Sequence, residues 1–96
     1  MTTMTAEELA LHSGDHIKQF STRVINSGLV HQVIAESYTG QIAVLRDNYA
    51  FAPPGTIAAT LYKDRATFEN DDTQWHRIMF ISDAASCDEF LAQINK

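Results

Sequence analysis

The sequence is poor in the residues that mark the more specialised classes of protein. It contains one cysteine, two prolines and four glycines among 96 residues. The lone cysteine, Cys87, excludes an internal disulfide framework and fits a reducing compartment. No two of the four glycines are close enough in the sequence to form a phosphate-binding loop. These absences argue against a disulfide-stabilised secreted domain and against a nucleotide-binding loop.

Positive charge is scarce as well. Seven Lys and Arg residues stand against twelve Asp and Glu residues, which gives a formal net charge of −5. The basic residues are scattered, and only Lys63 and Arg65 are near neighbours. Nucleic-acid binding needs clustered Lys and Arg to contact phosphates, so we expect no direct nucleic-acid partner. A basic protein surface is the better electrostatic match for this composition.

Long apolar runs are also missing. No stretch approaches the roughly 18 consecutive apolar residues that a membrane-spanning helix needs. The first residues lack the basic and apolar regions of a secretion signal, so we expect a cytoplasmic protein without a membrane partner. Hydrophobic residues nevertheless make up 45% of the chain and recur in periodic patterns. We therefore expect one folded domain over residues 1–96.

The strongest apolar pattern lies near the carboxyl end. Ile78–Ile81 is a run of four large apolar residues, which predicts a strand buried on both faces. An apolar stripe at helical spacing then predicts a helix, with Ser86 and Glu89 as its capping box. The stripe consists of Cys87, Phe90, Leu91 and Ile94. Because Cys87 belongs to this apolar stripe, we expect it to be a core residue and not a nucleophile.

The amino-terminal part predicts one clear helix and one ambiguous segment. Thr5 and Glu8 form a capping-box pattern for a short helix over residues 6–12, with Leu9 facing inward and Gly14 as a left-handed cap. The apolar spacing that follows favours a second helix (Ile17, Phe20, Val24, Ile25). A hairpin that pairs residues 21–25 with residues 30–35 around Ser27 and Gly28 is the alternative.

The middle of the chain predicts strands. Residues 41–47 follow a turn at Gly40 and alternate, with Ile42 and Val44 on one face and Ala43 and Leu45 on the other. Residues 56–62 resume the pattern after two prolines, which are rarely found inside a sheet. A tight turn at residues 63–65 and a short return strand at residues 66–69 are then expected.

Together these elements predict an α+β fold. It consists of a four-to-five-stranded, mainly antiparallel sheet with one or two amino-terminal helices and a carboxyl-terminal helix packed on it. Two or three helices can cover one face of the sheet and leave the other face in water. A large exposed apolar sheet face is normally an interface. We expect a homodimer or a docked partner there, with candidates Trp75, Met79 and Ile81 on one side and Ile78 and Phe80 on the other. A closed monomer with helices on both faces is the alternative.

The sequence shows no recognisable catalytic or metal-binding pattern. His12 and His16 are four residues apart, a spacing that chelates metals on a continuous helix, but Gly14 interrupts the segment and no third ligand is evident. Serine-hydrolase and dinucleotide motifs are absent, and the carboxylates lie in polar runs instead of forming a buried pair. We therefore expect no metal, no cofactor and a protein that is not an enzyme.

The favoured function is a small acidic interaction module, an inhibitor or adaptor that docks on a basic protein. Acidic residues beside exposed aromatics are suited to such docking, because the charges attract the partner and the rings anchor it. The partner-binding candidates are Glu69, Asp71, Asp72, Trp75 and Tyr62.

The alternative function is a small dimeric enzyme or a small-ligand-binding α+β domain. Its pocket would lie between the sheet and the helices, and its candidate residues are His31, His76 and Arg77. A cavity in which an imidazole and a guanidinium converge would favour this alternative.

Overall fold

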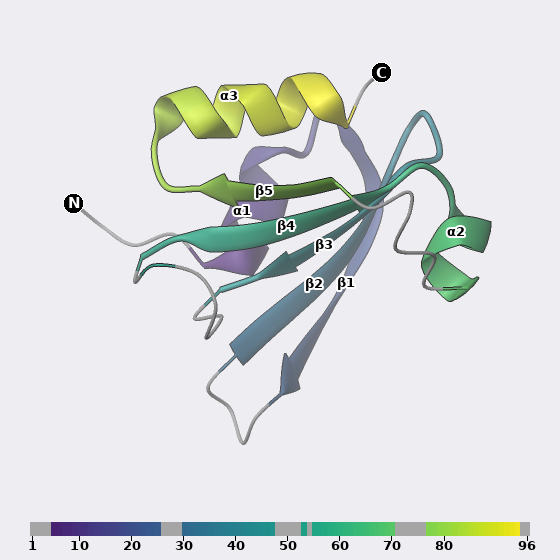
Figure 1. Ribbon diagram of the computed structural model, residues 1–96, viewed down its shortest axis with the longest axis horizontal. Helices are drawn as coiled ribbons and strands as arrows, with labels where there is room; N and C mark the ends of the chain where they lie inside the picture. Colours follow the sequence, from purple (N-terminus) through teal and green to yellow (C-terminus); the bar gives the residue numbers. More distant parts are fainter. Residues whose placement is uncertain (1–4, 26–29, 48–52, 54, 71–76, 95–96) are drawn as a thin grey trace.

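The computed structural model describes residues 5–25, 30–47, 53, 55–70 and 77–94. Its elements are α1 (Ala6–His12), β1 (Ile17–Ile25), β2 (Val30–Ser37), β3 (Ile42–Arg46), β4 (Ile57–Tyr62), α2 (Arg65–Asn70), β5 (Arg77–Ile81) and α3 (Ala84–Gln93), as Figure 1 shows. The five strands form one antiparallel sheet in the order β1-β2-β3-β4-β5. This arrangement confirms the expected α+β fold.

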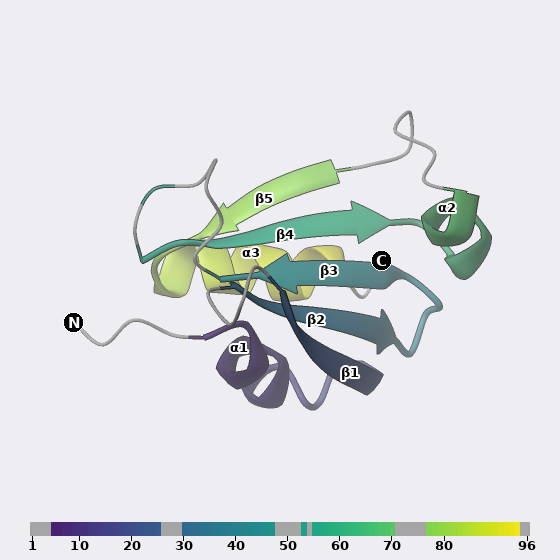
Figure 2. The same cartoon turned by 90° about the horizontal axis from the view of Figure 1, so that it is seen from below.

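The helices α1 and α3 cover the same face of the sheet, which we call the helix-covered face. Seen from below, α3 lies behind β3 and β4 (Figure 2). Leu9 of α1 and Phe90 of α3 are both completely buried in the core on this face. Fully burying a Leu or Phe side chain contributes about 1.5–3 kcal/mol. The strands contribute alternate residues to the same core: Val33, Ala35, Ala43, Leu45, Ile57, Ala59, Leu61, Met79 and Ile81.

The other face of the sheet, which we call the opposite face, carries a smaller cluster. Ile42, Val44 and Tyr62 are buried there, with the partly buried Ile34 and Phe68 packed against them. The predicted alternation of residues 42–45 between the two faces is therefore confirmed. Phe68 belongs to α2, the short helix at one end of the sheet (Figure 1). Among the described helices, only α2 packs on this face, and only near one end.

Two hydrogen bonds set the start of α1 and tie it to the sheet. The predicted cap is present, since the N–H of Glu8 donates to the hydroxyl oxygen of Thr5 at 3.1 Å. In addition, the N–H of Ala6 donates to Oδ2 of the buried Asp47, at the end of β3, at 2.8 Å. A carboxylate is favourable at a helix amino terminus. The predicted left-handed cap at Gly14 is wrong, because the C-cap of α1 is Ser13 and the described glycines with positive φ are Gly40 and Gly55.

The preference for a helix over residues 17–25 is wrong. This segment is the edge strand β1, and Ile25 pairs with Val30 of β2 as in the hairpin alternative. Four residues of this segment are β-branched, a class that loses rotamer freedom in a helix and is enriched in strands. The helical spacing of four apolar residues reflects local sequence only. The hydrogen-bonded pairing of β1 with β2 is the stronger determinant of its structure.

The prediction that Ile78–Ile81 is buried on both faces is also wrong. Met79 and Ile81 are buried on the helix-covered face, but Ile78 is 60% exposed and Phe80 48% exposed on the opposite face. Within the described sheet, the strand β5 pairs with β4 alone and lies at the edge. With α1 and α3 on one face, little of the described chain remains to cover the other side of this edge.

Two helix starts differ from the sequence prediction. The expected return strand at residues 66–69 is part of α2, whose first turn is capped by Asp64, because Oδ1 accepts from the N–H of Thr67 at 2.8 Å. The helix α3 is capped by Asp83 together with Ser86, and not by Ser86 together with Glu89. The apolar stripe of α3 is confirmed, since Cys87, Phe90 and Ile94 are buried and Leu91 is partly buried.

Replacing Asp47 with alanine should lower the free energy of unfolding by about 1–3 kcal/mol, because a helix N–H loses its charged, buried acceptor. Urea denaturation followed by circular dichroism measures this change. The matched control is Asp88→Ala on the exposed surface of α3, which should change stability by less than about 0.5 kcal/mol. Equal unfolding midpoints for the two variants would contradict the role of Asp47.

Candidate functional site

The two helices of the helix-covered face carry exposed acidic residues and no Lys or Arg. Glu7 and Glu8 are exposed on α1, and Asp88 and Glu89 are exposed on α3. We call the outward surfaces of these two helices the acidic helix layer. Because α1 and α3 share one face of the sheet, four carboxylates from distant parts of the sequence belong to the same layer.

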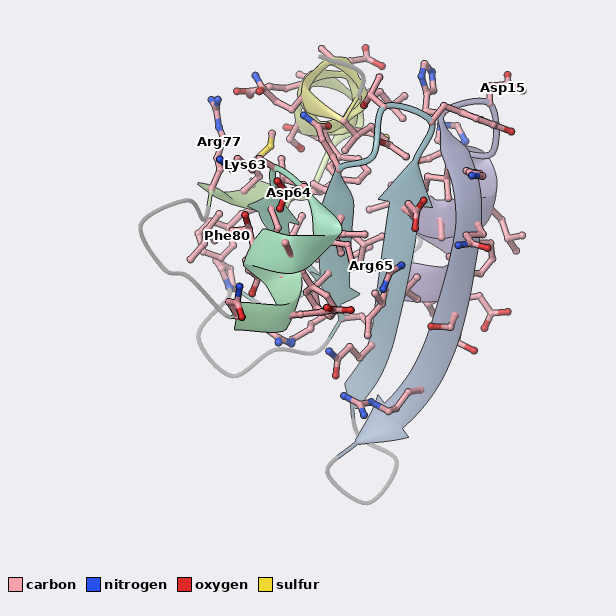
Figure 3. The ribbon with its side chains drawn as sticks, turned by 90° about the vertical axis from the view of Figure 1, so that its right-hand side faces the viewer. Asp15, Lys63, Asp64, Arg65, Arg77 and Phe80 are labelled. Carbon is pink, nitrogen blue, oxygen red and sulfur yellow. The ribbon has the colours of Figure 1, made fainter. Side chains whose placement is uncertain are left out.

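The basic residues of the described chain lie on the strands, on α2 and in the turn before α2. Arg23 and Arg46 belong to one cross-strand row on the opposite face. Arg65 of α2 extends over the sheet toward β2 (Figure 3). Arg77 is on the helix-covered side, where its Nη1 donates to Oε1 of Gln93 at 3.1 Å. Most positive charge is therefore separated from the acidic helix layer by the sheet.

One large apolar side chain is exposed within the acidic helix layer. Leu11 of α1 is 63% exposed. It follows Glu7 by four residues and Glu8 by three, so all three side chains lie on neighbouring positions of the helix surface. This arrangement combines negative charge with an apolar contact point, which together suit a protein partner.

Of the predicted partner-binding residues, the structure describes Glu69 and Tyr62. Glu69 is exposed on α2, on the other side of the sheet from α3. Tyr62 is only 7% exposed, and its ring meets that of Phe68 edge-on at a centroid distance of 5.3 Å. Tyr62 therefore supports α2 and does not present an exposed anchor. Asp71, Asp72 and Trp75 lie outside the described residues.

Of the residues predicted for a ligand pocket, the backbone positions of His31 and Arg77 are described. When the residue pairing is followed from Arg77 across β4 and β3, it reaches β2 at Ala35. His31 lies four residues before Ala35 on the same strand. His31 and Arg77 are thus separated by about 13 Å along the strands and about 14 Å across them. His76 lies outside the described residues.

A pocket of about 350 Å³ instead lies beside α2 on the opposite face. Its floor includes Ile34 and Phe68, and its rim carries an ion pair between Nη2 of Arg65 and Oε1 of Glu36 at 2.9 Å. The hydrogen bond from Arg65 and a second from Gln19 lower the pKa of Glu36. The sequence analysis missed this pair, because 29 residues separate its members. The described residues that line the pocket are Gln19, Phe20, Ser21, Ile34, Glu36, Arg65 and Phe68.

The arrangement of this pocket suits binding more than catalysis. Its acidic and basic groups are bonded to one another, and the described residues of its lining include no histidine or cysteine. A small molecule with an apolar body and a polar end matches the lining in size and chemistry. General acid–base catalysis would need a titratable group directed at the substrate instead of at a fixed partner.

Metal-ligating and nucleophilic side chains are dispersed in the described chain. The helix α1 ends at His12, so His16 does not continue the same helical surface. Among the described residues, no group of three or more His, Cys, Asp or Glu is placed to hold a metal ion. Cys87 is buried, and burial raises the pKa of its thiol, which disfavours the reactive thiolate. In the same ranges, no helix has the length and apolar character needed to cross a membrane.

Comparisons with protein families, with curated proteins and with solved structures found no match to this chain. Its function is therefore inferred from the charge, exposure and geometry of its own residues.

Acid should destabilise the protein partly through Glu36. Its pKa is lower in the folded state than its usual 4.5, so its stabilising contribution is present above about pH 4.5 and is lost as the pH falls through the folded value. Asp64 and Asp83 act in the same direction, because hydrogen bonds from Thr67 and Ser86 lower their pKa values below the usual 3.8. We expect the free energy of unfolding to fall as the pH is lowered from about 5 through the folded-state pKa values of these three groups.

Glu36→Gln should weaken this pH dependence, and Arg65→Met should weaken it similarly, since each removes the same ion pair. The double variant should show little further change. Urea denaturation across this pH range measures the effect. A full wild-type pH dependence in Glu36→Gln would contradict the assignment.

Proposed function

We propose that this chain is a non-enzymatic protein-binding module, an inhibitor or adaptor, whose acidic helix layer docks on a basic surface of a partner protein. The observation that carries the proposal is the separation of charge across the sheet. Glu7, Glu8, Asp88 and Glu89 are exposed on the two helices, and neither helix contains Lys or Arg. The net charge of −5 favours the same kind of partner.

The electrostatic part of this binding acts mainly on the rate of association. Carboxylates on one side of a protein attract a basic partner before contact and orient it. The attraction between exposed charges is screened over about 10 Å at 0.1 M salt. The association rate is therefore expected to fall with increasing salt, while the dissociation rate depends on the contacts formed in the complex.

Leu11 supplies the apolar contact that an acidic surface lacks. It is 63% exposed and borders the carboxylates of α1. Interfaces gain most of their binding energy from a few apolar or aromatic side chains that become fully desolvated, while surrounding charges contribute less. In the proposed complex Leu11 takes the anchoring role that the sequence analysis gave to Tyr62, which is buried.

The alternative of a ligand-binding domain receives less support. The pocket beside α2 has a suitable volume, but it lies on the opposite face from the predicted site between sheet and helices. Arg77 is not among the described residues that line it. The ion pair between Glu36 and Arg65 also has a structural role, since it links α2 to β2.

Glu89→Lys should reduce the association rate with the partner by about 3- to 10-fold at low salt. Its matched control is Glu69→Lys, because both glutamates are exposed on helices and each change takes the net charge from −5 to −3. The partner is first captured from lysate of the source cell and identified by mass spectrometry. Surface plasmon resonance with the purified partner then compares the variants. A larger effect of Glu69→Lys would place the docking surface at α2, and equal effects would contradict a localised surface.

Leu11→Gln should leave the association rate nearly unchanged and increase the dissociation rate by about tenfold, because a desolvated apolar contact is lost. Glutamine is a good helix former, so α1 should persist in the variant. The same resonance measurement tests this expectation, with circular dichroism as a check on folding. An unchanged dissociation rate would remove Leu11 from the interface.

A further inference from the structure

The edge strand β5 combines two properties that favour pairing with another strand. Beyond β4 it has no neighbour in the described sheet, so its outer N–H and C=O groups are not paired within that sheet. Ile78 and Phe80 are 60% and 48% exposed on the same side of this strand. An edge that carries large exposed apolar side chains is suited to association.

The other edge of the sheet is protected in ways that β5 is not. Strand β1 has an irregular register between Ile17 and Gln19, and its exposed residues include Lys18 and Arg23. Bulges and charged side chains of this kind oppose the addition of a further strand. In β5 the only charged residue is Arg77, at the first position.

The helices leave the β5 edge accessible. Seen from below, α3 lies behind β3 and β4 and is set back from β5 (Figure 2). Arg77 and Phe80 lie at the side of the sheet away from β1, with Arg77 toward α3 and Phe80 on the other side (Figure 3). An approaching strand would therefore meet the β5 backbone without displacing α3.

We propose that this edge binds a second copy of the same chain, with the two β5 strands antiparallel about a two-fold axis at Met79. The two five-stranded sheets then continue into one another. Met79 is the middle residue of Arg77–Ile81, so this register pairs the full length of both strands. The proposal depends on residues other than those of the acidic helix layer and goes beyond the proposed docking on a basic protein.

The sequence of β5 is complementary to itself in this register. Ile78 of each copy lies opposite Phe80 of the second copy, so two pairs of a β-branched and an aromatic residue form on the opposite face. Arg77 lies opposite Ile81 of the second copy, and the second copy's Asp83 follows Ile81 by two residues. Asp83 lies just beyond the end of β5, and its carboxylate caps α3, which holds a negative charge at this end of the strand. Two symmetric pairs of Arg77 with Asp83 provide the charge match that an unrelated strand would lack.

This dimer has a consequence for docking. Antiparallel neighbours in a sheet are related by a two-fold axis perpendicular to it, so the helix-covered faces of both copies lie on the same side. The acidic helix layer is thereby doubled, and a partner with an extended basic surface could contact both copies. Because the interface involves one short strand and four large apolar side chains, it is smaller than standard stable interfaces. We expect a dissociation constant of about 10–100 µM.

Analytical ultracentrifugation of the full chain over a concentration series tests the association. The mass should approach twice the chain mass of 10.7 kDa at high concentration. The variant Ile78→Thr/Phe80→Thr should weaken the dimer at least tenfold, while threonine preserves the β propensity of the strand. The control Leu11→Gln/Tyr38→Gln removes two similarly exposed apolar residues, at 63% and 65%, away from β5. It should dimerise like the wild type.

Disulfide cross-linking tests the register in a Cys87→Ala background. Residues directly opposite in an antiparallel pair have Cβ atoms about 4.5–5.5 Å apart. A mixture of Ile78→Cys and Phe80→Cys chains, one carrying a tag that changes its mass, should therefore yield a mixed cross-linked dimer. Either variant alone should cross-link much more slowly, because identical positions are displaced from one another along the strands.

Three outcomes would overturn the proposal. These are a monomer at concentrations of about 1 mM, a dimer that the Ile78→Thr/Phe80→Thr variant leaves intact, and rapid cross-linking of Ile78→Cys with itself. Thermal unfolding followed by circular dichroism verifies that each variant is folded. A chain that stays monomeric but binds its partner in a Glu89-dependent manner would leave the proposed function standing while excluding the dimer.

Discussion

The packing of α1 and α3 on the same face of the sheet is the contact on which the other features depend. Leu9 and Phe90 are completely buried there, together with alternate residues of β2 to β5. With both longer helices on one face, the described chain has only α2 for the other, and α2 covers one end of it. Met79 and Ile81 are therefore core residues, while Ile78 and Phe80 of the same strand remain at the surface.

The same packing distributes charge. Glu7, Glu8, Asp88 and Glu89 are far apart in the sequence but belong to one layer, and Arg23 and Arg46 are on the opposite face. The chain thus has two surfaces of different character. The acidic helix layer suits attraction of a basic protein over a distance, and the β5 edge suits short-range pairing with backbone and apolar contacts. A β5 dimer would keep both acidic helix layers on the same side, so the two proposed interactions are compatible.

Local patterns predicted the fold well where one periodicity dominated. The alternation of residues 42–45, the apolar stripe of α3 and the cap at Thr5 are all present. Prediction failed over β1, where the spacing of four apolar residues fitted a helix while β-branched residues and pairing with β2 favoured a strand. It also failed at α2, although Asp64 three residues before Thr67 is a recognisable capping pattern. At the candidate sites, Glu69 is exposed as expected, but the acidic helix layer, the buried state of Tyr62 and the pair of Glu36 with Arg65 were not predicted.

From composition and periodicity alone, the chain is an acidic α+β protein with an antiparallel sheet, because net charge and local apolar spacing need no knowledge of distant contacts. The position of β5 at the edge, the exposure of Ile78 and Phe80, and the shared face of α1 and α3 follow from the order of the strands and the side on which each helix packs. These properties depend on which distant segments meet. An apolar run shows that burial is favourable, but only the neighbours that reach it determine which of its side chains are covered.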